Sequence, residues 1–132
     1  MTFFKEGRRS SYSEVVETLK MLIKQNILSE LETEEVYKVF LRLFSCTEDA
    51  LENYLKEVGY RTKSSKQTFF TASRLNMVSD LVVWERAIQL KEDIEANKQV
   101  DKEILVEFIS EPYYQAMKIL NIHLEDKHRS KH

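Results

Sequence analysis

The sequence predicts an all-α protein, a mostly antiparallel bundle of about five helices in a single domain. The 132-residue chain contains only two glycines and one proline, the residues on which the tight turns of β-rich folds depend. Apolar residues recur at steps of three and four along most of the chain, as they do on the buried face of an amphipathic helix. The connections between these stretches are short, which favours antiparallel neighbours.

Composition and charge indicate a globular protein without a nucleic-acid signature. Hydrophobic residues make up 42% and charged residues 32% of the chain, and the formal net charge is −2. We expect the short basic stretches 5–9, 61–66 and 127–132 to be solvated ends and loops, with contact to RNA or a nucleotide as the alternative. With one cysteine, no signal peptide and no membrane-spanning run, we expect a cytoplasmic protein that does not enter a membrane.

The first helix is expected after an N-terminal arm, residues 1–10, whose two phenylalanines pack on the body or on a partner. Ser11 precedes Glu14 by three residues, the spacing of a capping box. The helix that follows is predicted over residues 12–28. Its apolar face consists of Val15, Val16, Leu19, Leu22, Ile23 and Ile27.

A long second helix is predicted over residues 33–58. Thr33 is its expected N-cap, and Gly59 ends it because glycine readily adopts the left-handed conformation found after many helices. So long an apolar stripe must be covered by other helices. The stripe consists of Val36, Val39, Phe40, Leu43, Phe44, Ala50, Leu51, Tyr54, Leu55 and Val58.

A short third helix is predicted over residues 66–76, capped by Ser64 or Ser65, and a fourth over residues 80–96. Ser79 or Asp80 begins the fourth helix. The inner face of the third helix consists of Phe69, Phe70, Ala72 and Leu75. The inner face of the fourth helix consists of Leu81, Trp84, Ala87, Ile88, Lys91 and Ile94, with Lys91 at the edge and its charged end pointing outward.

The last helical stretch begins at Asp101 and is predicted to kink or break at Pro112, which cannot donate a backbone hydrogen bond. Its apolar positions extend to Leu124, so the bundle domain is predicted over residues 11–126 and a basic tail over 127–132. These positions are Ile104, Leu105, Phe108, Ile109, Tyr113, Met117, Leu120, Ile122 and Leu124.

No catalytic, cofactor or metal site is predicted. The three histidines stand near the C-terminus, and although His128 and His132 are four residues apart, no cysteine or carboxylate is fixed beside them. Cys46 has no histidine nearby in sequence and is interpreted as a small packing residue. The carboxylate pairs alternate with lysines, as on a solvated helix face, and two glycines are too few for a phosphate-binding loop.

Trp84 and the pair Tyr113–Tyr114 are the most conspicuous aromatic positions. We expect Trp84 to pack in the core, with an interface anchor as the alternative. We expect the two tyrosines to lie in the core or at a subunit contact.

Four short motifs follow one another from about residue 40 to residue 125. They are Phe44 with Leu51-Glu52-Asn53-Tyr54-Leu55 and Gly59, then Leu75-Asn76-Met77-Val78, then Trp84, then Pro112-Tyr113-Tyr114-Gln115-Ala116-Met117. In this order they resemble the HEPN superfamily, specifically its nucleotidyltransferase substrate-binding type. Such proteins are small helical bundles, commonly dimeric, encoded beside a minimal nucleotidyltransferase. The resemblance therefore implies a helical bundle with a homodimeric or nucleotidyltransferase partner.

The chain departs from the family where its active members carry Arg-Asn-x-x-x-His. These three positions hold Lys91, Glu92 and Ala96. Lysine keeps the charge but lacks the planar fork of arginine, and alanine cannot transfer a proton. We therefore expect a non-catalytic binding or scaffolding module, with Trp84 and the two tyrosines at or near its contact surface.

Two other functions remain open. The first is a HEPN-type enzyme that handles RNA or a nucleotide through a rearranged site, for which Lys91, Glu92 and Arg86 are the candidate residues. The second is an unrelated helical adapter or regulator whose packing pattern resembles the family by coincidence.

Overall fold

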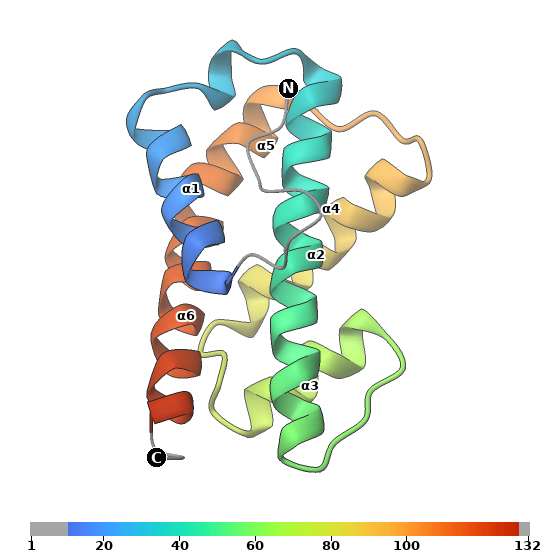
Figure 1. Cartoon of the computed structure of the whole chain (residues 1–132). Helices are drawn as coiled ribbons and strands as arrows, with labels where there is room; N and C mark the ends of the chain where they lie inside the picture. Colours follow the sequence, from blue (N-terminus) through green and yellow to red (C-terminus); the bar gives the residue numbers. More distant parts are fainter. Residues whose placement is uncertain (1–10, 130–132) are drawn as a thin grey trace.

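The computed structural model describes residues 11–129, and these form a bundle of helices without a β-strand (Figure 1). The predicted all-α fold with about five helices is confirmed, since the last three elements run on without a break. Residues 1–10 of the predicted arm and 130–132 of the predicted tail lie outside the described residues. The elements are α1 (Tyr12–Lys24), η1 (Leu28–Glu30), α2 (Thr33–Glu57), α3 (Ser65–Arg74), α4 (Leu81–Glu95), α5 (Lys102–Phe108), η2 (Ile109–Tyr113) and α6 (Tyr114–Arg129).

The long helix α2 is the centre of the bundle, in contact with α1, α3, α4 and α5 (Figure 1). Its predicted N-cap is wrong by one residue: Glu32 has the extended backbone of a cap, and Thr33 is already helical. The cap is made by the backbone, because the Glu32 carbonyl accepts from the amides of Glu35 and Val36 at 3.0 Å each. The predicted stop at Gly59 is confirmed.

Four residues in the left-handed conformation end helices α1 to α4: Asn26 (φ 54°), Gly59 (φ 96°), Asn76 (φ 61°) and Asn97 (φ 60°). The amide after each one donates to a carbonyl five residues back, as in a Schellman motif, for example from Ile27 to Leu22 at 3.0 Å. The predicted end of the first helix at residue 28 is therefore wrong, because asparagine at position 26 turns the chain after Lys24.

Other predicted caps agree with the structure. The hydroxyl of Ser11 accepts from the Glu14 amide at 3.2 Å, and that of Ser64 accepts from the Gln67 amide at 3.1 Å. Asp101 caps α5 by accepting from the Ile104 amide at 3.1 Å.

Pro112 lies inside a π-helical turn and does not break the helix. The Tyr114 amide donates to the carbonyl of Ile109, five residues back, so the turn is wider than in an α-helix. A wider turn keeps the helix continuous past a residue that has no amide hydrogen. The helix also continues through residues 127–129, which the sequence had placed in a tail.

An aromatic cluster forms the core where α2, α3, α4 and η2 meet. The Trp84 ring stacks on Phe69 with centroids 4.8 Å apart and meets Tyr113 edge-on at 5.3 Å. Phe40, Phe44 and Phe108 extend the cluster. Four positions predicted to be buried are instead exposed: Val58, Phe70, Ile104 and Ile122.

Candidate functional site

The aromatic residues singled out by the sequence are mainly structural. Trp84 is 1% exposed and Tyr113 is fully buried, so the expected core packing of Trp84 is confirmed. Tyr114 is half-buried on α6, and the ammonium of Lys118 lies 5.3 Å from its ring centroid. Of these three rings, Tyr114 alone offers surface to a second molecule.

Lys91 and Ala96, two of the three positions aligned with the HEPN motif, make local contacts at the end of α4. The Lys91 ammonium lies 3.1 Å from the Glu95 carboxylate and 5.7 Å from the centroid of the Phe44 ring on α2. Ala96 is the exposed C-cap residue of α4. Lys91 therefore lies at the edge of the buried face, as predicted, and its charge is already paired.

The residues of the alternative rearranged site do not converge. Lys91 lies against Phe44 of α2, whereas the guanidinium of Arg86 lies 5.8 Å from the ring centroid of Phe108 on α5. Glu92 lines a groove shared with α3. The three side chains thus leave α4 towards three different helices, while proton transfer requires its groups within hydrogen-bond reach of one substrate.

Cys46 is half-buried on α2, and burial raises the pKa of its thiol above the usual value, with nearby Arg42 opposing the shift. A protonated thiol is a poor nucleophile. The imidazole Nδ1 of His123 donates to the Met77 carbonyl at 2.8 Å, which ties α6 to the loop before α4. In the described part of the chain, no three His, Cys, Asp or Glu side chains are arranged to hold a metal ion.

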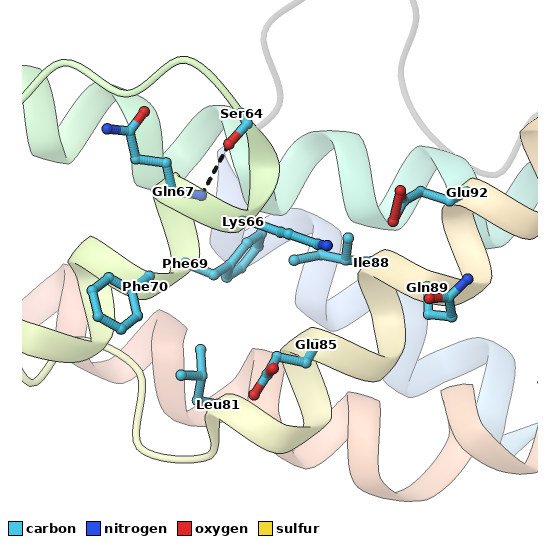
Figure 2. Close-up of a pocket in the computed structure, with 10 residues that line it drawn as sticks. All are labelled: Ser64, Lys66, Gln67, Phe69, Phe70, Leu81, Glu85, Ile88, Gln89 and Glu92. Atoms are coloured by element: carbon cyan, nitrogen blue, oxygen red, sulfur yellow. Dashed lines mark hydrogen bonds between the residues drawn. The ribbon is translucent and has the colours of Figure 1, made fainter.

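A groove of about 640 Å³ between α3 and α4 is the best candidate for a binding site (Figure 2). Its floor is apolar: Phe69 and Ile88 are buried, Leu81 is half-buried, and Phe70 closes one end with 55% of its surface exposed. A concave apolar surface of this size is typical of sites that bind a ligand or a side-chain cluster of a partner.

Polar side chains form the rim of this groove. Glu85 and Glu92 come from α4, and Lys66 extends from α3 toward Ile88 (Figure 2). Because the rim carries two carboxylates and one ammonium group, its net charge is negative. Ser64, Gln67 and Gln89 complete the lining with neutral polar groups.

Local sequence positions the α3 wall of the groove. The Ser64 cap starts α3, and Ser65 donates to the carboxylate of Glu48 on α2, which anchors the first turn of α3. Phe69 then points into the core, where it stacks on Trp84. Phe70 follows directly on the helix, about 100° further round, and it faces outward.

The sequence interpretation missed this groove because it assigned both phenylalanines to the core. No local feature of the sequence distinguishes the two rings, because consecutive helical residues are both buried elsewhere in the bundle, as at Leu43 and Phe44. The acidic rim carried no signal either, because carboxylates at helical spacing are equally typical of a solvated face.

Comparisons of the chain with protein-family models, with curated proteins and with solved structures give no match. None of the helices formed by the described residues combines the length and the apolar character needed to cross a membrane. The candidate site is therefore defined by its own geometry.

Proposed function

We propose that this chain is a non-catalytic helical binding or scaffolding module that docks onto a protein partner through the groove between α3 and α4. The observation that carries the proposal is the groove itself, which combines an apolar floor, the exposed ring of Phe70 and an acidic rim. The fitting partner presents an apolar side-chain cluster flanked by basic residues, for instance on one face of an amphipathic helix.

The HEPN resemblance supplies two candidate partners, a second copy of the chain and a nucleotidyltransferase. The packing of α2 against α4 is compatible with that resemblance. Because the apolar faces of α2 and α4 are covered within one chain, either partner would have to use exposed apolar residues such as Phe70.

The HEPN-type enzyme remains an alternative, but no geometric observation favours it. Its candidate residues Lys91, Arg86 and Glu92 point to different helices. Incubation of micromolar protein with labelled RNA is expected to leave the RNA intact. Cleavage that is lost in Lys91→Ala would contradict the non-catalytic proposal.

A designed helical peptide tests the binding proposal. It carries two phenylalanines four residues apart on one face and lysines on the flanks, and its binding is followed by fluorescence anisotropy. We expect Phe70→Asp to weaken binding at least tenfold, because it places a charge where the peptide would bury a ring. Ile104→Asp is the matched control, since Ile104 is similarly exposed but lies on α5. Equal weakening by both substitutions would reject the groove as the binding surface.

A further inference from the structure

The occupant of the groove can be inferred from its chemistry and from the part of the chain that lies outside the described residues. We propose that residues 1–10 of the same chain dock into the groove between α3 and α4 and block it to other partners. This inference rests on the proposed function of the groove as the binding surface.

The chemistry of the segment matches that of the groove. Phe3 and Phe4 supply two adjacent aromatic rings, and three basic residues follow against one acidic residue, Glu6, so residues 1–10 carry a side-chain charge of 3 − 1 = +2. The basic residues are Lys5, Arg8 and Arg9. An apolar pair followed by positive charge complements an apolar floor bordered by carboxylates.

The carboxylates of the rim can accept the basic side chains. Glu85 and Glu92 are both exposed on α4, and both line the groove. Since they stand seven residues apart, they lie on the same side of the helix about 10 Å from each other. Adjacent side chains of an extended segment point to opposite sides, so one of the two arginines, Arg8 or Arg9, can face these carboxylates.

The segment joins the described structure at α1, which packs on α2, the helix that also supports α3. The Tyr12 hydroxyl lies 3.0 Å from the Thr47 hydroxyl on α2, and the next residue, Glu48, accepts a hydrogen bond from Ser65 at the start of α3. Ser65 itself directly follows Ser64, which lines the groove. The beginning of α1 and the beginning of α3 are thus attached to adjacent residues of α2.

The chain is long enough to make this connection within one molecule. Crossing α2 requires about 10–12 Å, and moving one turn along α3 to Phe69 adds about 6 Å. The seven residue steps from Ser11 back to Phe4 span about 23 Å when extended. A tether this short gives an effective concentration on the order of millimolar, so even a weak contact would be populated.

A spin label tests the contact directly in the full-length chain. A nitroxide is attached at Thr2→Cys in a Cys46→Ser background, and the amide signals of the ¹⁵N-labelled protein are compared before and after reduction of the nitroxide. We expect the signals of Phe70, Leu81 and Ile88 to lose at least half of their intensity, and those of α5 to keep it. Unchanged groove signals would overturn the inference.

A mixed sample separates docking within one molecule from docking between molecules. Spin-labelled chain without ¹⁵N is added to ¹⁵N-labelled chain without the nitroxide. We expect no loss of groove signals in this sample. If the groove signals lose as much intensity as in the chain that carries both ¹⁵N and the nitroxide, docking within one chain is overturned. Such a loss would indicate exchange of the segment between copies.

Charge reversal tests whether the acidic rim holds the segment. Glu85→Lys with Glu92→Lys is expected to restore the groove signals, and adding Arg8→Glu with Arg9→Glu is expected to broaden them again. Glu107→Lys, an exposed charge reversal on α5, serves as the control and should leave the broadening unchanged. If the broadening of the groove signals stays the same in these charge-reversal variants, the inference is overturned.

The designed peptide distinguishes failure of this inference from failure of the proposed function. If the segment blocks the groove, Phe3→Ala with Phe4→Ala should tighten peptide binding at least threefold. Peptide binding without any contact of the nitroxide to the groove would refute the inference and leave the function standing. A peptide that binds neither the parent chain nor the double alanine variant would refute both.

Discussion

Two tyrosine hydroxyls lie next to Thr47 in the interior, and they differ in their hydrogen bonding. The Tyr12 hydroxyl is 3.0 Å from the Thr47 hydroxyl, which itself donates to the Leu43 carbonyl at 2.9 Å. The Tyr113 hydroxyl is buried near the same threonine, but it lacks the distance and angle of a hydrogen bond to any described residue. Replacing each tyrosine by phenylalanine removes one oxygen and keeps the ring, so the pair of variants compares a bonded with an unbonded hydroxyl.

The expected effects have opposite signs. Tyr12→Phe should lower the free energy of unfolding by about 1 kcal/mol, the usual contribution of one intramolecular hydrogen bond. Tyr113→Phe should raise it by about 1–2 kcal/mol, because a buried polar group without a partner carries its desolvation cost. Tyr113→Ala is the contrasting variant and should lower it by about 3–5 kcal/mol, since it removes a ring from the aromatic cluster.

Urea unfolding followed by circular dichroism measures these differences through the linear extrapolation to water. The slope should stay constant across the variants, which would show that the extent of unfolding is unchanged. A Tyr113→Phe variant that loses 1 kcal/mol or more would refute the reasoning, because it would mean that the hydroxyl is hydrogen-bonded in the folded protein. An unchanged free energy of unfolding in Tyr12→Phe would likewise show that the hydrogen bond between Tyr12 and Thr47 contributes nothing to stability.

Three further predictions concern ionisation and packing. Burial raises the pKa of the Cys46 thiol from 9.0, so its reaction with a disulfide reagent should reach half of its maximal rate above pH 9 in the folded protein and near the ordinary value in denaturant. Burial also raises the pKa of the Tyr12 and Tyr113 hydroxyls, so the contribution of these phenols to stability should be constant below pH 10 and fall above it, by up to about 1.4 kcal/mol per pH unit for each phenol, as urea midpoints of the parent and the two phenylalanine variants would reveal. Finally, Phe69→Ala should lower the free energy of unfolding by about 3–5 kcal/mol and Phe70→Ala by less than about 1 kcal/mol, because only Phe69 is buried; equal losses would contradict the outward orientation of Phe70.

The helices and their order follow from local patterns in the sequence. The spacing of apolar residues predicted α2 almost to its ends. Ser11 was correctly identified as a cap, Ser64 was one of two candidate caps, and Asp101 was the expected start of the last helical stretch. These features depend on residues within one or two turns of each other, so they can be recognised in the sequence without knowledge of the fold. Asn26, Asn76 and Asn97 belong to the same class of local signal, although only Gly59 was interpreted as a stop.

The binding surface depends on packing between helices that are distant in sequence. Whether Phe69 or Phe70 faces the core is decided by which of them meets Trp84, and that contact exists only after α3 docks against α4. The same docking brings Glu85 and Glu92 to the rim of an apolar groove, whereas in sequence they resemble ordinary solvated charges. Periodicity specifies that a helix has an apolar face, but the rotation of that face and the space left between two helices are set by the side chains of both partners, and these meet only in the tertiary structure.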